Sequence, residues 1–242
     1  MKAIVSAYYQ IPSKQSHSWY LPHLIRWFRS IGKLTRVHFF TTADIHQELS
    51  RRIPNDSKHI TFHIMPMERF QSARIEDGFW ERQYSRDPER YHSPELGMIW
   101  YEKRHFVIEA MKVDPSDVFF WCDAGCIRDD KTEYFARNFG TRDVCVDDGT
   151  MHLQQVDRLK DEEFYQYPTT AIACAIMAGN RRAWIRFVQD YEESLREFDT
   201  VNISAISDQY VTARCVRKNT SGYTLHPEQT AISEWFKFLE LL

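Results

Sequence analysis

Residues 118–125 read VFFWCDAG, and this segment indicates how the rest of the chain is organised. The positions from Val118 to Cys122 are apolar or aromatic without interruption, and the run ends at Asp123. Strands that are buried on both faces of a parallel sheet have such continuous apolar runs. The segment therefore predicts a central strand that places one carboxylate at the edge of a sheet.

The segments before this strand alternate between two periodicities. Residues 2–9, 36–42 and 59–66 have strand patterns, and residues 19–31 and 43–53 between them have helical apolar spacing. A β-α-β-α-β order predicts parallel strands with helices packed on the sheet. Further strands are predicted at 144–148, 170–179 and 223–226, and further helices at 94–113, 180–198 and 207–218.

No internal repeat or linker interrupts this pattern, so we predict a single α/β domain over residues 1–242, with a mostly parallel central sheet flanked by helices. Residues 68–93 are the least regular part and are rich in charged and aromatic residues. They fit either a solvated insertion or an active-site flap, because irregular insertions of α/β domains often carry binding loops.

Composition restricts the classes of partner. The net charge of −3 argues against a general nucleic-acid surface. The 5 cysteines are scattered and odd in number, which favours a reducing, cytoplasmic location. The N-terminus does not resemble a signal peptide, and no stretch is apolar enough for a membrane span. Aromatic residues reach 14%, which suits stacking on sugars or bases but also a large aromatic core.

Asp123 is the first candidate functional residue. Ligands of open parallel sheets collect at the carboxyl ends of the strands, where Asp123 is expected. The small residues Ala124 and Gly125 leave room for a ligand near the backbone. A carboxylate there can hold a divalent cation or a ribose hydroxyl, although a turn aspartate that caps the next element has the same pattern.

Lys103 is the second candidate. It falls within the apolar stripe of the helix predicted at 94–113, four residues after Ile99 and four before Val107. A lysine in that position either extends its ammonium group to the surface or binds an anion.

Several motifs together resemble one family. The segments IVSAYYQIPSK, PELGMIWYEKRHFVIEA, FFWCDAGCIR and SDQYV are similar in order and spacing to the HtrL/YibB family of proposed glycosyltransferases, over residues 3–226. The resemblance implies a GT-A-like fold that binds a nucleotide-diphospho-sugar.

The resemblance also implies a metal. In GT-A enzymes a D-x-D motif at the corresponding strand end binds Mn²⁺ or Mg²⁺ together with the donor diphosphate. Asp123 matches its first position, but Gly125 stands where the second carboxylate is expected. Asp147 or Asp148 are alternative ligands, and His226 resembles a late metal-binding histidine of some retaining enzymes, although a lone histidine is more often structural.

Two further features concern the sugar. Asp208 and Gln209 resemble an Asp-Gln pair that contacts the transferred sugar, and the alternative is that Asp208 only supports helix capping. The family's glycine-rich run is replaced at 170–179 by alanines and Met177, which indicates a differently shaped pocket. The resemblance therefore does not carry over the identity of the donor sugar.

These features predict transfer of a sugar from a nucleotide-diphospho-sugar, most simply a UDP-sugar, to a hydroxyl of a glycan, glycoconjugate or protein acceptor. Asp208, Gln209 and Lys103 are the expected catalytic residues. The residues expected to bind the donor and its cofactor are Ser6, Tyr8, Tyr9, Lys14, Lys103, Asp123, Ala124 and Gly125, and those expected to bind metal are Asp123 and His226. The alternatives are a catalytically weak or inactive nucleotide-sugar-binding protein and a metal-dependent phosphohydrolase.

Overall fold

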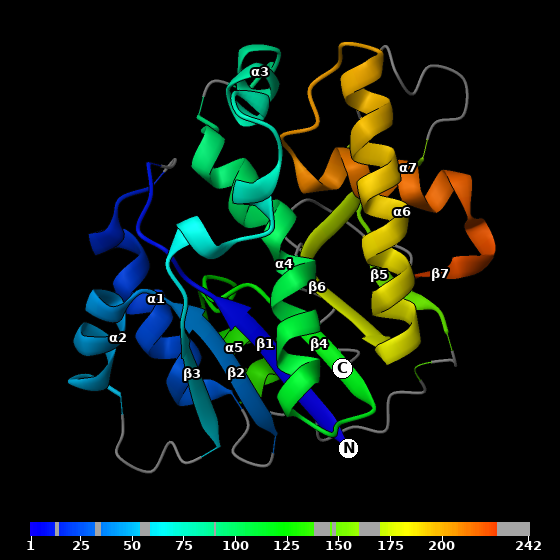
Figure 1. Ribbon diagram of the computed structural model, residues 1–242. Coiled ribbons are helices and arrows are strands. Elements are labelled where there is room, and N and C mark those ends of the chain that lie inside the picture. The colour runs from blue at the N-terminus through cyan, green and yellow to red at the C-terminus, as the bar shows by residue number, and fades with distance from the viewer. Residues whose placement is uncertain are drawn as a thin grey trace.

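A computed structural model describes residues 1–12, 15–31, 35–53, 59–89, 91–137, 146, 149–159 and 170–226. Its centre is a seven-stranded sheet with the order β3-β2-β1-β4-β6-β5-β7. Helices cover both faces of this sheet (Figure 1). The expected α/β class with a mostly parallel central sheet flanked by helices is confirmed.

The strands are β1 (Lys2–Ala7), β2 (Arg36–Thr41), β3 (Ile60–Ile64), β4 (Val118–Cys122), β5 (Met151–Gln155), β6 (Ile172–Asn180) and β7 (Tyr223–His226). The pairs β1–β2, β1–β4, β2–β3 and β5–β7 are parallel. Strand β6 runs antiparallel to both β4 and β5. The sequence analysis missed β5, and the strand predicted at 144–148 lies outside the described residues except for Val146.

The helices divide between the two faces. One face carries α4 (Pro94–Val113), α6 (Arg181–Thr200) and α7 (Asp208–Lys218), and the other carries α1 (His17–Ser30), α2 (Ala43–Ser50) and α5 (Asp130–Arg137). The shorter elements are α3 (Phe79–Ser85) and the 3₁₀ turns η1 (Met67–Arg69), η2 (Ser72–Arg74) and η3 (Thr220–Gly222). Within the described residues, none of these helices is long and apolar enough to cross a membrane.

Strand β4 is buried on both faces, as its apolar run predicted. Phe119 and Trp121 pack in the cluster under α4 and α6, whereas Phe120 and Cys122 pack in the cluster under α1. All four side chains are at most 1% exposed. Side chains alternate across a strand, so a strand between two helical layers needs apolar residues at every position.

Local signals explain where α4 begins. The Ser93 hydroxyl accepts a hydrogen bond from the Leu96 N–H at 3.2 Å, and Pro94 occupies the first turn, where its missing N–H costs nothing. At α7, Ser207 is the N-cap residue as expected, but its side chain makes no capping hydrogen bond. The start of α4 is therefore encoded locally, whereas that of α7 depends on its packing.

The irregular segment 68–93 is fixed to α4 through a buried carboxylate. Glu102 is 2% exposed and accepts hydrogen bonds from the backbone N–H groups of Gln71 and Ser72, both at 3.0 Å. Gln83 in α3 extends the attachment, because its amide oxygen accepts from the Ala205 N–H at 2.8 Å. The segment is thus tied both to α4 and to the loop before α7.

Glu102 should make stability depend on pH. Burial raises its pKa from 4.5 to about 7, although the two N–H groups and Arg104 act in the opposite direction. When the pKa of a carboxyl is higher in the folded than in the unfolded state, its protonation stabilises the fold. This stabilisation is complete at pH values below the pKa in the unfolded chain, and it is lost as the pH rises towards 7. We expect urea unfolding to show a loss of up to ~3 kcal/mol between pH 4.5 and 7, at about 1.4 kcal/mol per pKa unit.

Glu102→Gln should remove this part of the pH dependence, because the amide does not ionise. Glu68→Gln, at an exposed carboxyl, is the matched control and should leave the profile unchanged. Parallel stability profiles for the wild type and Glu102→Gln would contradict the assignment to Glu102.

Candidate active site

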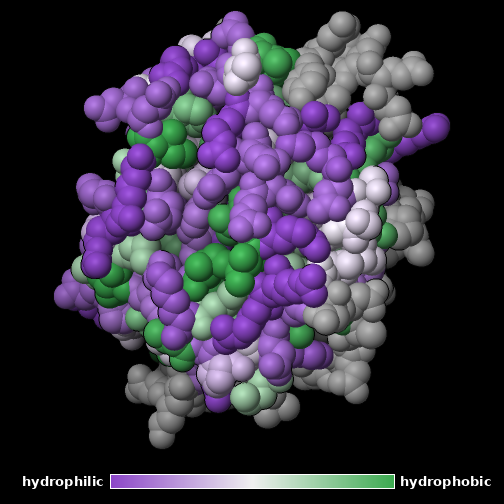
Figure 2. All heavy atoms as spheres, turned by 45° about the vertical axis from the view of Figure 1, so that its right-hand side comes forward, coloured by the Kyte–Doolittle hydropathy of each residue, from purple (hydrophilic) through white to green (hydrophobic). Residues whose placement is uncertain are grey.

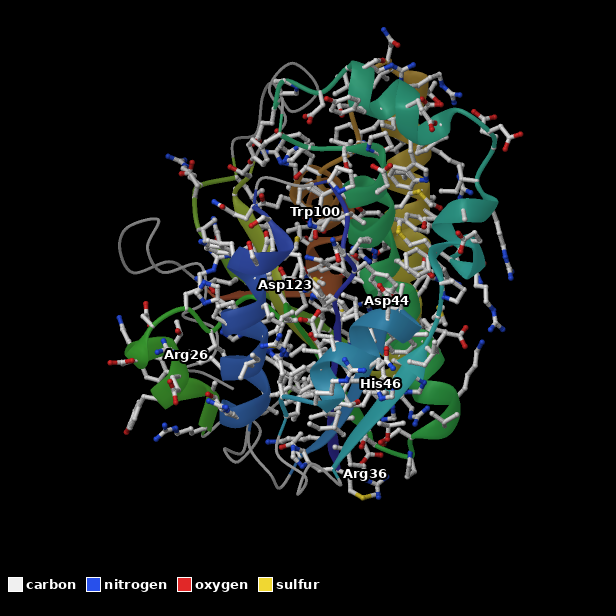
Figure 3. All side chains as sticks on the ribbon, turned by 90° about the vertical axis from the view of Figure 1, so that its left-hand side faces the viewer. Arg26, Arg36, Asp44, His46, Trp100 and Asp123 are labelled. Carbon is white, nitrogen blue, oxygen red and sulfur yellow. The ribbon has the colours of Figure 1, made fainter. Side chains whose placement is uncertain are left out.

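A pocket opens at the carboxyl ends of β1 and β4, beside the first turns of α4. Its volume is about 160 Å³. It is lined by Ala7, Tyr8, Tyr9, Ile11, Tyr20, Leu96, Ile99, Trp100, Lys103, Trp121, Asp123, Ala124, Gly125 and Arg128. Asp123 and Trp100 lie towards one end of the sheet, away from Arg36 at the start of β2 (Figure 3). This is the end where open parallel sheets bind their ligands.

The chain turns sharply after β4. The Asp123 N–H donates to the Ala175 carbonyl at 2.8 Å, and the Asp123 carbonyl accepts from the Cys126 N–H at 3.1 Å. A Cβ atom on Gly125 would lie 3.3 Å from a ring carbon of Tyr20, which is a tight contact. The small residue expected to admit a ligand therefore also admits the Tyr20 ring, which forms one wall of the pocket.

The floor of the pocket contains a buried charge cluster. The Lys103 Nζ atom lies 3.1 Å from Asp123 Oδ1 and 2.9 Å from Asp208 Oδ2, and it donates to the Cys174 carbonyl at 3.1 Å. The Lys103 and Asp208 side chains are each 4% exposed, whereas Asp123 is 34% exposed. The ammonium group therefore lies among two carboxylates and one carbonyl, and of the two cluster members that line the pocket, Lys103 and Asp123, the more exposed is Asp123.

The cluster fixes the protonation of Lys103. Burial alone would lower its pKa, but the Asp123 and Asp208 carboxylates outweigh burial and hold the pKa above the usual range for lysine. Burial raises the pKa of Asp123, and Lys103 opposes this rise. With both carboxyls ionised, the cluster has a net charge of −1.

Asp123 is also oriented by its own strand. The Trp121 indole Nε1–H donates to Asp123 Oδ1 at 2.7 Å. The Lys103 ammonium lies 5.7 Å from the centre of a Trp121 ring, within the range of a cation–π contact. The carboxylate is thus held from two sides before any ligand arrives.

Tyr8 and Tyr9, which follow β1, both line the pocket. The Tyr8 hydroxyl lies 2.8 Å from His17 Nδ1, and His17 Nε2 lies 2.9 Å from a Glu48 carboxylate oxygen. The Tyr9 hydroxyl donates to the Met65 carbonyl at 2.9 Å. Both rings are therefore fixed at their hydroxyl ends and present their aromatic faces or edges to the pocket.

Other predicted residues lie elsewhere. Ser6 is fully buried and donates to the Cys122 carbonyl at 2.6 Å, so it joins β1 to β4. Asp208 lies beneath Lys103, and the Gln209 amide donates to the Ile172 carbonyl at 3.0 Å. None of these three is among the pocket-lining residues, whereas Ala124 and Gly125 are. Lys14 lies outside the described residues.

The described residues do not make a fitting site for Mn²⁺ or Mg²⁺. The Lys103 ammonium stands between the two carboxylates that a cation would bridge. His226 on β7 lies 3.0 Å from His152 Nδ1, and β6 and β5 separate its strand from β4. Among the described residues, no group of three or more histidine, cysteine or acidic side chains could hold a metal ion. Asp147 and Asp148 lie outside those residues, and the metal stays a prediction.

Eight of the fourteen described residues that line the pocket were not recognised as site residues from the sequence, and three of them, Tyr20, Trp100 and Arg128, have side chains suited to ligand binding. Trp100 belonged to an apolar helical stripe, and Tyr20 fell within a predicted helix, so both resembled core residues. Arg128 lies five positions after Asp123. That proximity in sequence was a signal that Arg128 could share the site with Asp123.

Comparisons with known proteins give distant structural likenesses. No family model matches the chain, and no curated protein matches its sequence. Mouse xyloside xylosyltransferase 1 in its apo form is similar with 10% identity and a TM-score of 0.48, over 93% of this chain and 85% of that chain. A glycosyltransferase involved in glycosylation of the major capsid of PBCV-1 has 8% identity and a TM-score of 0.42, over 100% and 99%.

A third likeness is to CMP:2-keto-3-deoxy-manno-octonic acid synthetase complexed with CTP. It has 9% identity and a TM-score of 0.43, over 94% of this chain and 89% of that chain. All three likenesses concern the arrangement of the chain, and at these identities they carry no argument about activity.

Removing the Lys103 charge should destabilise the fold. Lys103→Met leaves Asp208 as an uncompensated buried carboxylate, and breaking a buried ion pair in this way costs about 3–5 kcal/mol. Urea unfolding at pH 7 measures the loss. Lys112→Met is the control on the same helix, because Lys112 is 61% exposed and should change stability by under ~1 kcal/mol.

The double variant Lys103→Met with Asp208→Asn should recover part of the loss, because the second change removes the unpaired charge. If Lys103→Met alone is as stable as the wild type, the assignment of Lys103 as the counter-ion of buried carboxylates is wrong.

Proposed function

We propose that this protein is a glycosyltransferase that moves a sugar from a nucleotide-diphospho-sugar, most simply a UDP-sugar, to a hydroxyl of a glycan, glycoconjugate or protein. The observation that carries the proposal is the pocket, where aromatic side chains surround one oriented carboxylate at the carboxyl ends of β1 and β4. The resemblance of the sequence motifs to the HtrL/YibB family supports the same proposal.

The pocket suits the two uncharged parts of such a donor. Tyr8, Tyr20 and Trp100 offer aromatic surface against which a nucleobase or the apolar face of a sugar can pack. Asp123 offers an acceptor for the hydroxyl groups of ribose or of the transferred sugar. Because Trp121 and Lys103 fix this carboxylate, little of its freedom would be lost on binding.

The stereochemical course stays open. An inverting enzyme needs a carboxylate base near the acceptor, and Asp208 would have to give up its contact with Lys103 to serve as one. A retaining enzyme would use Gln209 near the sugar, and its amide now bonds to carbonyls at the start of β6. We propose both residues as the candidates for contact with the sugar or the acceptor.

The alternatives differ in what they release. A phosphohydrolase of this type needs a second acidic residue near Asp123, and Gly125 occupies the position two residues on. A binding protein needs only the pocket. Incubation with UDP-sugars therefore separates the three classes: UDP release supports a transferase, release of UMP with a sugar 1-phosphate supports a hydrolase, and binding without release supports a binding protein.

UDP should raise the melting temperature of the wild-type protein, because a ligand that binds only the folded state stabilises it.

Asp123→Asn keeps the size of the side chain but removes its charge. We expect this variant to lose ~10²-fold or more in turnover, the scale of an oriented electrostatic group. Glu193→Gln, at an exposed carboxyl on α6, is the control.

Repeating the UDP melts with Mn²⁺ and with a chelator tests the predicted metal separately. If no nucleotide or nucleotide sugar shifts the melting temperature under either condition, the proposed function is wrong.

Gln209→Ala should separate binding from chemistry. If Gln209 contacts the transferred sugar during the reaction, turnover falls by ~10²-fold while UDP affinity by calorimetry stays within a few-fold of wild type. Weakened UDP binding with normal turnover at saturating donor would instead place Gln209 at the nucleotide and contradict this role.

A further inference from the structure

The charges around the pocket are unequally available to a ligand. Among the described residues that line it, the charged side chains are Lys103, Asp123 and Arg128. A nucleoside diphosphate carries at least two negative charges, and it would meet the Asp123 carboxylate, which is 34% exposed. An additional positive charge close to the pocket is needed to offset this repulsion.

Lys103 is poorly suited to supply that charge. Its ammonium group already lies within 3.1 Å of Asp123, Asp208 and the Cys174 carbonyl, and its side chain is 4% exposed. A direct bond to a phosphate would require Lys103 to release one of these acceptors, and releasing Asp208 would leave a buried charge unpaired. Lys103 therefore acts as the fixed counter-ion of the two aspartates.

Arg128 is placed differently. It is an exposed residue of the turn that follows β4, and it lines the same pocket as Asp123. Its Nε–H donates to the Gly125 carbonyl at 2.9 Å, and its Cζ atom lies 5.4 Å from the centre of a Trp19 ring. A main-chain hydrogen bond and a cation–π contact thus hold the guanidinium at the side of the pocket.

We propose that Arg128 binds the diphosphate of the nucleotide-sugar donor, while Lys103 positions Asp123. This inference rests on the proposed function. A guanidinium presents paired N–H donors that match phosphate oxygens, and it is a permanent cation. The same turn carries Asp123 and Arg128. The carboxylate that accepts hydrogen bonds from sugar hydroxyl groups and the guanidinium that donates hydrogen bonds to phosphate are therefore set at a fixed separation.

Arg128 also stabilises the leaving group. When the bond between the sugar C1 atom and the diphosphate oxygen breaks, the electron pair stays on that oxygen and its negative charge increases. C1 forms its new bond to the acceptor hydroxyl oxygen, whose proton passes to a base at the acceptor or to the departing diphosphate. A cation held beside the diphosphate therefore lowers the barrier as well as the dissociation constant.

The test compares two ligands that differ only in the diphosphate. Calorimetry measures UDP and uridine binding to the wild type, Arg128→Gln, Arg128→Lys and Arg26→Gln, each with a chelator and with Mn²⁺. Arg26→Gln is the control, because Arg26 pairs with Asp130 and Glu133 away from the pocket lining. Unfolding curves establish that each variant is folded.

With the chelator, Arg128→Gln should bind UDP ~10- to 100-fold more weakly, the scale of a lost charge-assisted hydrogen bond, and uridine within twofold of wild type. The UDP affinity of Arg128→Lys should fall between those of the wild type and Arg128→Gln, because lysine keeps the charge but not the paired donors. Arg26→Gln should match the wild type for both ligands.

Four results would overturn the inference. Unchanged UDP affinity in Arg128→Gln, or equal losses for UDP and uridine, would remove Arg128 from the phosphate. UDP binding that requires Mn²⁺ and is indifferent to Arg128 would assign the charge to the metal and leave the proposed function standing. A wild type that binds neither UDP nor any nucleotide sugar would overturn the proposed function, and this inference with it.

Discussion

The ion-pair cluster of Lys103 with Asp123 and Asp208 joins four elements at one point. The ammonium group of Lys103 comes from α4. Its acceptors come from the end of β4, the start of α7 and the backbone of β6. A buried charge is stable only when it is paired, so these elements have to meet in this arrangement. The direction of Asp123 in the pocket follows from that constraint, as does the position of the first turn of α7.

Around this cluster the pocket is built from side chains that the core holds rigidly. Tyr8 is fixed through His17 and Glu48, Tyr9 through Met65, and Asp123 through Trp121. Groups fixed in advance lose little entropy when a ligand binds. On the face of the molecule that Figure 2 shows, hydrophobic residues form small areas among hydrophilic ones.

Much of the fold could be predicted from the sequence, since continuous and periodic apolar patterns report burial directly. The continuous run of β4 identified a central strand, and the alternation of strands and helices before it identified parallel pairing. Strand β5, MHLQQ, was missed because its polar residues do not resemble a buried strand. Its His152 and Gln154 side chains are nevertheless buried, at 3% and 4% exposed, and the neighbouring strands provide that environment.

The sequence by itself determined the α/β class, the strand end at which Asp123 lies, and the unusual position of Lys103 in an apolar stripe. Only the tertiary structure decided what these residues face: Lys103 meets Asp208, which is distant in sequence, and among the described residues of the pocket lining Arg128 rather than Lys103 is the exposed cation. The physical reason is that apolar burial follows from a residue's own side chain and local spacing. The pairing of charges depends on which distant elements are brought within a few ångströms, and no local pattern encodes that.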